Sequence, residues 1–136
     1  MAKVETFHCS VVTPERAVLE CEARFVAFPA HDGEMGVLTD RAPLVCKMGI
    51  GSLRVQTRDA THVLFVDGGF AQVLNNRLTI LTEQARRVEE LDAAGVGRAL
   101  ADALAMKVED DAGFVARNNA VQRARAQRRL LEAARR

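Results

Sequence analysis

The sequence has no tryptophan, no tyrosine and six phenylalanines among its 136 residues. Proteins that bind single-stranded nucleic acid stack bases on exposed aromatic rings, so this shortage argues against such a stacking surface. The chain also lacks the run of about 18 apolar residues that a membrane-spanning helix needs. Met1–Thr6 has no apolar centre of the kind found in secretory signals. We therefore expect a soluble protein that stays in the compartment where it is made.

Cysteine is scarce as well. The three cysteines, Cys9, Cys21 and Cys46, are an odd number and contain no CxxC pair. This spacing predicts neither a disulfide framework nor a zinc site, and no other metal site is predicted. Cys9 and Cys21 fall on the apolar side of strand-like patterns, where a thiol acts as a small buried hydrophobe.

Positive charge is confined to the end of the chain, although the net charge is only +1. Residues 1–84 carry 8 basic and 10 acidic side chains, residues 85–110 carry 4 and 6, and residues 111–136 carry 7 and 2. The net charges of these segments are therefore −2, −2 and +5. All seven positive charges of the last segment are arginines.

Up to Glu83 the apolar residues recur with a period of two. Runs of roughly five residues, such as FHCSVV, SLRVQT and RLTIL, are separated by turn signals such as AHDGEMG, DGG and NNR. Short strands with this spacing predict an antiparallel sandwich or barrel. The run Phe25–Phe28 leaves no polar face, so we expect some strands to be covered on both sides.

After Glu83 the composition becomes alanine-rich and helical. Leu91, Val96, Leu100, Leu104 and Val108 fall at near-helical spacing, and a second run covers Phe114–Ala134. Asp92 and Asp111 are the expected N-caps of the two helices. The prediction is a mainly β plus α fold, with an N-terminal antiparallel β-sandwich or barrel over residues 1–85 and a C-terminal αα-hairpin over residues 86–136.

The hairpin is expected to be weakly packed. Gly95 and Gly97 each cost about 1 kcal/mol relative to alanine within a helix. The helices are expected to meet through Ala116, Ala120 and Ala124, which bury little apolar surface. A hairpin with so little buried surface is able to open.

The loop HDGEMGVLTDRAPLV, residues 31–45, places His31, Asp32 and Glu34 close together. A histidine beside carboxylates suggests a small enzyme. However, the loop supplies no nucleophile, and acid–base catalysis needs carboxylates whose pKa values are separated by burial or pairing.

The same loop has the residues of a stiff turn. Gly33 and Gly36 permit backbone angles that are forbidden to other residues, and Pro43 fixes the direction of the chain. We interpret the loop as a turn that presents an acidic side chain for docking.

The residues GEMGVLTDRAPLV, preceded by FVAFPAHD and followed by MGIGSLRV, resemble the N-terminal domain of the epsilon subunit of the F-type ATP synthase. LFVDGGFAQV matches the SGG-x-x-x-V hairpin of that family, and RLTILTEQA extends the match. The likeness covers nearly the whole chain, because a β-domain followed by a helical hairpin also matches in order and length.

This resemblance implies a ten-stranded β-sandwich and a rotor subunit of the central stalk, with catalysis in other subunits. It implies the gamma subunit and the c-ring as partners, and transient contact with the alpha/beta catalytic head. Membrane association would come only through the complex, at the cytoplasmic face of a bacterial inner membrane or the stromal face of a plastid thylakoid. No nucleic acid is expected as a partner.

By the same resemblance, Glu34 and Arg41 face the polar loops of the c-ring, with Gly33, Gly36 and Pro43 shaping the turn. Arg41 stands where the family often has histidine, and Thr39–Asp40 replace its usual PG. The resemblance also implies a regulatory hairpin that inhibits ATP hydrolysis when extended. Its basic face would meet an acidic loop of the catalytic beta subunits, and it comprises Arg117, Arg123, Arg125, Arg128 and Arg129.

Some bacterial members bind ATP through an [IL]DxxRA motif and arginines on the second helix. Leu91–Asp92 match the opening of the motif, and Arg125 and Arg129 lie in a similar RAQRRL segment. The arginine and alanine of the motif are replaced by Gly95 and Val96, so we expect no tight ATP binding and no other cofactor.

Two other interpretations remain open from the residues alone. The arginine-rich helix would suit a basic nucleic-acid-binding or other interaction module, since its charge can pair with phosphates. It would equally be an ordinary solvated helix face.

Overall fold

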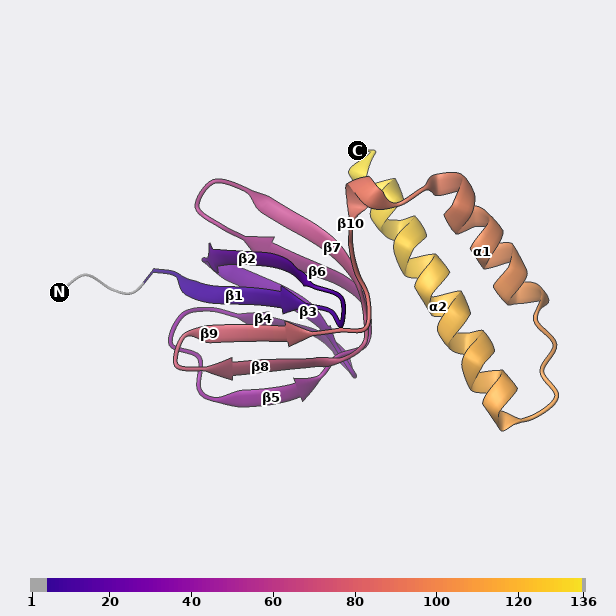
Figure 1. Ribbon diagram of the computed structural model, residues 1–136, viewed down its shortest axis with the longest axis horizontal. Coiled ribbons are helices and arrows are strands. Elements are labelled where there is room, and N and C mark those ends of the chain that lie inside the picture. Colours follow the sequence, from indigo (N-terminus) through magenta and orange to yellow (C-terminus); the bar gives the residue numbers. More distant parts are fainter. Residues whose placement is uncertain (1–4, 136) are drawn as a thin grey trace.

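The computed structural model describes residues 5–135. Arg136 and residues 1–4, which make up most of the Met1–Thr6 segment, lie outside the described residues. Two five-stranded sheets stack as a sandwich, and two helices follow beside one end of it (Figure 1). The strands are β1 (Phe7–Val12), β2 (Ala17–Ala23), β3 (Phe25–Ala30), β4 (Gly33–Val37), β5 (Leu44–Lys47), β6 (Ile50–Gln56), β7 (Thr61–Asp67), β8 (Phe70–Leu74), β9 (Arg77–Leu81) and β10 (Ala85–Arg87). A 3-10 turn, η1 (Val88–Glu90), leads to α1 (Ala93–Ala105) and α2 (Asp111–Ala134).

The strand order is β2-β1-β9-β8-β5 in one sheet and β10-β7-β6-β3-β4 in the other. The predicted β-sandwich followed by an αα-hairpin is confirmed, as are the ten strands that the family resemblance implies. Neighbouring strands are antiparallel except β1 and β9, which pair in parallel. Period-two patterning predicts which residues point inward, but it does not predict which strands pair or whether they run parallel. The sequence therefore did not indicate the β1–β9 pair.

Alternation along each strand fills the space between the sheets. Phe7, Cys9 and Val11 of β1 are buried, whereas His8 and Ser10 between them are partly exposed. The same alternation buries Ala71 and Val73 in β8 and Leu78 and Ile80 in β9. The inward faces form one continuous apolar core.

Strand β7 is covered on both faces. Leu64, Phe65 and Val66 are all fully buried. Phe65 belongs to a separate cluster with Ala126 and Leu130 of α2, so the helix covers the outer face of this strand. The expectation that some strands have no polar face is confirmed here.

Strand β10 pairs with β7 and carries the second sheet to Arg87. The sheet therefore continues two residues past the expected division between residues 85 and 86. The short turn η1 then turns the chain toward the hairpin (Figure 1).

Both helices begin at an aspartate that caps them. The side chain of Asp92 accepts a hydrogen bond from the backbone N–H of Gly95 at 3.0 Å, as predicted. The second cap is Asp110, which accepts from the N–H of Gly113 at 2.7 Å. Asp111 was the expected cap, but it is the first helical residue. Two adjacent aspartates satisfy the same capping preference, so the pattern could not separate them.

The two helices meet through a small cluster. It consists of Leu100, Ala103, Val121 and Ala124, with Ala120 packed beside them. The predicted roles of Ala120 and Ala124 are confirmed. The third expected contact, Ala116, is exposed. Leu104 and Val108, which the helical spacing assigned to the first helix, are exposed as well, and Val108 lies beyond the end of α1 at Ala105.

Candidate docking edge and regulatory hairpin

Glu34 lies in β4, just after the turn from β3. Its carboxylate accepts a hydrogen bond from the guanidinium of Arg54 at 3.1 Å, and the two side chains are 54% and 44% exposed. Exposed pairs of this kind contribute at most about 1 kcal/mol. Glu34 can therefore exchange Arg54 for an external partner at little cost.

The residues that shape the turn act in two ways. Gly33 has a φ of 146°, which a side chain would disfavour. Gly36 does not have a positive φ, but a Cβ there would lie 2.9 Å from Cε2 of Phe25. Its role is therefore to make room for the phenylalanine ring rather than to bend the backbone. Pro43 is exposed in the segment that leads into β5.

Glu34 lies at the start of β4, whereas Arg41 follows the end of this strand, so the two residues lie toward opposite ends of the sandwich. The preceding residue, Asp40, has a φ of 62°, and its N–H donates to the side-chain oxygen of Asn76 at 2.7 Å. The amide of Asn76 donates back to the Asp40 carboxylate at 3.1 Å. These bonds fix the loop to the β8–β9 turn and leave Arg41 exposed.

Glu34 and Arg41 nevertheless share one edge of the molecule. Strand β4 is the last strand of one sheet and β5 the last strand of the other, and the loop with Arg41 joins them. Glu34 is three residue steps from the end of β4, which at about 3.3 Å per residue is about 10 Å, and the loop carries Arg41 further. We call this surface the β4–β5 edge.

The histidine and aspartate at the start of the loop are not enclosed by other side chains. His31 and Asp32 are both exposed in the turn between β3 and β4. Across residues 5–135 no cluster of histidine, cysteine, aspartate or glutamate side chains is suited to a metal ion.

A serine–histidine–glutamate chain occurs elsewhere, on the outer face of β1 and β2. The Ser10 hydroxyl lies 3.4 Å from Nε2 of His8, whose Nδ1 lies 3.2 Å from the Glu22 carboxylate. The same hydroxyl donates to Glu20 at 3.1 Å, so it is not directed as a nucleophile. This polar network crosses two adjacent strands of a sheet face, and we interpret it as cross-strand pairing.

The hairpin packs on the sandwich through the C-terminal half of α2. Ala126 and Leu130 contact Phe65, and four partly buried side chains surround them: Ile50, Val63, Val88 and Leu91. Burying a leucine or phenylalanine side chain stabilises by about 1.5–3 kcal/mol each. This cluster therefore favours the packed position of the hairpin.

One ion pair joins the hairpin to the sandwich. Nε of Arg123 donates to the Asp67 carboxylate at 2.6 Å, and the side chains are 40% and 17% exposed. The backbone N–H of Asp67 bonds to the carbonyl of Gln84 and the hydroxyl of Thr82, which fixes the carboxylate at the end of β7. We call this pair the Asp67–Arg123 latch.

The other arginines of α2 differ from Arg123. Arg128 lies 3.8 Å from Glu132 one turn further on. Within residues 5–135, no carboxylate lies within 4 Å of Arg117, Arg125 or Arg129. The basic face that the sequence predicted is thus partly engaged and partly open.

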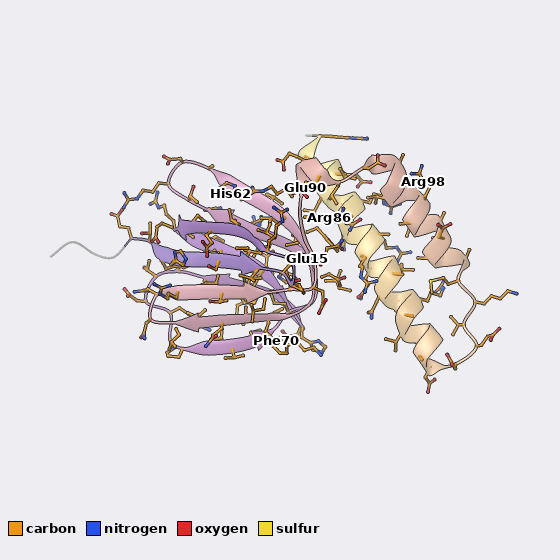
Figure 2. The ribbon with its side chains drawn as sticks, viewed as in Figure 1. Glu15, His62, Phe70, Arg86, Glu90 and Arg98 are labelled. Atoms are coloured by element: carbon orange, nitrogen blue, oxygen red, sulfur yellow. The ribbon has the colours of Figure 1, made fainter. Side chains whose placement is uncertain are left out.

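The residues proposed for ATP do not gather in one cavity. Leu91 and Asp92 line a hollow of about 270 Å³ together with Arg86 and Glu90. Figure 2 labels Arg86 and Glu90 where the sandwich meets the hairpin. Arg129 lines a different hollow with Gly51, Ser52 and Leu130. The carboxylate of Asp92 is already used to cap α1.

The sequence analysis missed an apolar area on the outer face of β5, β8 and β9. Phe70 and Leu81 are cross-strand partners there, and Phe70 is labelled in Figure 2. Four exposed side chains make up this outer apolar patch: Val45 (69% exposed), Phe70 (52%), Leu81 (49%) and Leu74 (45%). Along β8 the buried Ala71 and Val73 alternate with exposed residues, so Phe70 and Leu74 face outward although they are apolar.

Along residues 5–135, none of the helices combines the length and apolar character needed to cross a bilayer.

Residues 6–88 match the family model described as ATP synthase, Delta/Epsilon chain, beta-sandwich domain. A curated relative, the ATP synthase epsilon chain of Rhodopirellula baltica, is 44% identical over 91% of this chain and 97% of its own length. The ATP synthase epsilon chain of Nitratidesulfovibrio vulgaris (strain Miyazaki F) is 40% identical over 65% of this chain and 66% of its own.

The fold itself recurs in a cryo-EM structure of the Euglena gracilis mitochondrial ATP synthase. A chain there matches with a TM-score of 0.83 and 24% identity, over 100% of this chain and 85% of its own length. A match with a TM-score of 0.68 and 12% identity comes from the central stalk and c-ring of the Tetrahymena thermophila enzyme. The matched sandwich and the identity along nearly the full length show that the chain belongs to the ATP synthase delta/epsilon chain family.

Proposed function

We propose that this chain works as the epsilon subunit of an F-type ATP synthase, in which it couples rotation of the stalk to ATP synthesis. Membership of the family carries this assignment, since the match extends along nearly the full length of a curated epsilon chain. As an epsilon chain it is a stalk subunit, and catalysis lies in other subunits of the complex. It reaches the membrane only through the complex, at the cytoplasmic face of a bacterial inner membrane.

The β4–β5 edge is the surface that we assign to the c-ring. Glu34 lies at one end of this edge and Arg41 at the other, so a ring of polar loops contacts both only if the edge lies flat on it. The low cost of separating Glu34 from Arg54 supports this docking. Rigid attachment of Arg41 through Asp40 and Asn76 supports it at the other end.

The gamma subunit is the proposed partner of the outer apolar patch. The four side chains share one sheet face, with Gln72 and Thr79 between them. Large exposed apolar side chains grouped on one face often mark an interface. A hollow of about 420 Å³ is lined in part by Phe70 and Leu81 and could bind an apolar side chain of the partner. The patch also includes β5, so one partner can continue from it to the β4–β5 edge.

The hairpin is the proposed inhibitor of ATP hydrolysis. Arg117, Arg125 and Arg129 are free to pair with carboxylates of the catalytic beta subunits, and guanidinium groups do so in bidentate fashion. At about 1.5 Å rise per residue, α2 is about 36 Å long and reaches well beyond the sandwich. Breaking the Asp67–Arg123 latch would free a further arginine for the same surface.

The packed and extended positions of the hairpin must be close in free energy for such a switch to work. Exposing Phe65 and Leu130 costs about 3–6 kcal/mol in total. Three or four charge-assisted hydrogen bonds to carboxylates, each worth about 1.5–3 kcal/mol, offset that cost. ATP is not assigned a role in this balance, because Gly95 stands where the motif has its arginine.

The test is ATP hydrolysis by the cognate catalytic head stripped of its epsilon subunit. We would add back the full chain, or the full chain with Arg117→Gln, Arg125→Gln, Arg128→Gln and Arg129→Gln together. Arg98→Gln on the exposed face of α1 serves as the control for a lost charge.

Inhibition by the unmodified chain and the control, but not by the quadruple variant, is the expected result. Binding is followed separately by gel filtration, and all versions should bind through the sandwich. Binding without inhibition by the unmodified chain would mean that the arginines form only a solvated face. Failure of every version to bind would overturn the stalk assignment itself.

The second candidate function, a nucleic-acid-binding module, rests on the +5 charge of the last segment. Retention of the chain on heparin and on duplex DNA at physiological salt would distinguish a nucleic-acid-binding module from a stalk subunit. Elution below that salt concentration is expected, because Arg123 and Arg128 are already paired within the chain.

A further inference from the structure

Cys9 and Cys21 face each other across the β1–β2 pair. They are direct register partners in the antiparallel ladder, so their side chains point to the same face of the sheet. Cys9 is fully buried, whereas Cys21 is partly exposed on β2, the edge strand of its sheet. One thiol is thus protected and the other is accessible.

The backbone brings the two cysteines within reach of each other. His8 donates its N–H to the carbonyl of Asn76, and the Val12 carbonyl accepts from Thr82, so these residues of β1 direct their backbone groups away from β2. The backbone groups of Cys9 therefore point toward β2. Residues paired in this way have Cα atoms about 5.5 Å apart. That separation lies within the Cα range of disulfides, about 4.4–6.8 Å. The Cβ atoms of a hydrogen-bonded pair lie about 5.5 Å apart, whereas a disulfide needs about 3.5–4.5 Å, so forming the S–S bond draws β2 toward β1 and makes the bond easy to reduce.

Cys21 opens into a hollow of about 400 Å³ lined by Thr6, Glu22, Thr57, Arg58 and Asp59. A hydroperoxide is small enough to enter it. The exposed guanidinium of Arg58 is bonded to Glu5 at 3.4 Å across the rim. The accessible thiol is therefore reached from solvent without any movement of the sandwich.

The two thiols differ in pKa. A hydrogen bond from the Cys9 thiol lowers the pKa of Cys21 to about 7, with His8 and Arg87 acting in the same direction and burial and Glu22 opposing them. The same hydrogen bond, together with burial, raises the pKa of Cys9 far above its ordinary value. At neutral pH the negative charge belongs on Cys21, and the thiolate is the reactive form.

We propose that Cys21 is a peroxide-reactive thiol and that Cys9 is its resolving partner, which together give a reversible cross-strand disulfide. The Cys21 thiolate attacks one oxygen of a hydroperoxide, the O–O bond breaks, and the other oxygen leaves as alkoxide or hydroxide. Sulfur is oxidised by two electrons to sulfenic acid, and the peroxide is reduced. The Cys9 thiol then attacks the sulfenic sulfur, and its proton passes to the departing oxygen, so the S–S bond forms and the S–O bond breaks with loss of water.

The third cysteine is excluded from this reaction by its place in the sheet. Cys46 lies on β5, at the opposite edge of the same sheet from Cys21. With about 4.8 Å between neighbouring strands, Cys46 is about 14 Å from Cys9 and about 19 Å from Cys21. An intrachain disulfide can therefore form only between Cys9 and Cys21, and Cys46 serves as an internal reference thiol.

The experiment treats the full chain with hydrogen peroxide at pH 7 and maps the products by peptide mass spectrometry. A peptide pair joined through Cys9 and Cys21 is the expected product, and millimolar glutathione should reverse it. A Cys46→Ala variant should react in the same way. The inference does not depend on the proposed function, because the reaction is measured on the isolated chain.

Two substitutions at Cys9 separate its two roles. Cys9→Ser retains a hydroxyl donor, so Cys21 should oxidise at a similar rate but stop at a sulfenic acid that dimedone traps. Cys9→Ala removes the donor and should slow the first step about fivefold, since loss of thiolate is only partly offset by higher nucleophilicity. Circular dichroism checks that both variants are folded.

Oxidation of Cys46 before Cys21 would overturn the proposal. So would conversion of Cys21 in the unmodified chain to a sulfinic acid with no link to Cys9.

Discussion

The sandwich and the hairpin bury side chains of very different size. The sandwich core contains Phe28, Leu53, Leu78 and Ile80, all at most 1% exposed and all within one cluster. The helix–helix cluster contains one leucine, one valine and two fully or nearly buried alanines. Large interlocking side chains hold the sandwich together as one body, whereas small side chains join the two helices, and the hairpin is attached to the sandwich by the Leu130–Phe65 cluster and the Asp67–Arg123 latch. This contrast suits a subunit with a fixed attachment and a movable regulator.

The largest expected effect comes from the sandwich core. Phe28→Ala should lower the free energy of unfolding by about 3–5 kcal/mol, because it removes a fully buried ring and leaves a cavity. Leu100→Ala in the hairpin should cost only about 2 kcal/mol, since this leucine is already 9% exposed. Hydrogen exchange followed by mass spectrometry measures both regions in one experiment.

The contrast between sandwich and hairpin is tested by which backbone amides lose protection from hydrogen exchange. Phe28→Ala should speed exchange in all the strands, and Leu100→Ala only in the helices, because a weakly packed unit opens on its own. If Leu100→Ala also loosened β1 and β6, the chain would be one cooperative unit and the contrast would be wrong.

The second prediction concerns the contact between the two regions. Leu130→Ala should weaken docking of α2 on β7 by about 2–3 kcal/mol, since it empties the space against Phe65. Leu131→Ala is the matched control, because this neighbour is only partly buried and lies outside the cluster.

Exchange in the second half of α2 should rise for Leu130→Ala and stay near the unmodified value for Leu131→Ala. In the hydrolysis assay, Leu130→Ala should inhibit more strongly, because less free energy is needed to extend the hairpin. Weaker inhibition would show that Leu130 contributes to the extended state instead.

The sequence predicted this contrast better than it predicted the contacts. Period-two runs identified the inward residues of the strands, and alanine content identified a hairpin whose helices bury few large side chains against each other. Asp67 and Arg123 are 56 residues apart, and no local pattern indicates that the end of β7 faces the middle of α2. The outer apolar patch was missed for a related reason, because alternation cannot say which outward face has a partner.

The loop of residues 31–45 shows that residues close in sequence can also lie far apart in space. Glu34 and Arg41 are seven positions apart in the sequence and were treated as one turn. An extended strand between them carries Arg41 to the other end of the sandwich, where Asn76 fixes its loop. Sequence proximity across a strand is therefore a poor guide to proximity in space.

The third prediction measures the Asp67–Arg123 latch. A double-mutant cycle with Asp67→Asn and Arg123→Gln should give a coupling free energy of about 1 kcal/mol, since the short hydrogen bond is strong but Arg123 is 40% exposed. Exchange of α2 amides again supplies the free energies.

The exposed pair of Arg128 and Glu132 is the control for this cycle. Its coupling should be about 0.3–0.5 kcal/mol, as for other pairs one turn apart. At 1 M salt, where the screening length falls to about 3 Å, the control should vanish and the latch should persist in part. Equal couplings for the two pairs would mean that the latch contributes nothing beyond a surface contact.

The smallest expected effect distinguishes the two aspartates that begin α2. The Asp110 side chain accepts a hydrogen bond from Gly113, so Asp110→Ala should cost about 1 kcal/mol of helix stability. Asp111 makes no cap, and its charge near the positive end of the helix dipole contributes only about 0.3–0.5 kcal/mol. Helix content by circular dichroism, followed through a urea titration, should therefore fall more for Asp110→Ala.

Because the hairpin has so little buried surface, a single cap is a large fraction of its stability. The same substitution in a helix anchored by larger side chains would have a much smaller relative effect. Equal losses for the two variants would indicate that the N-terminal turn of α2 is frayed in solution, which would extend the movable element back to the α1–α2 loop.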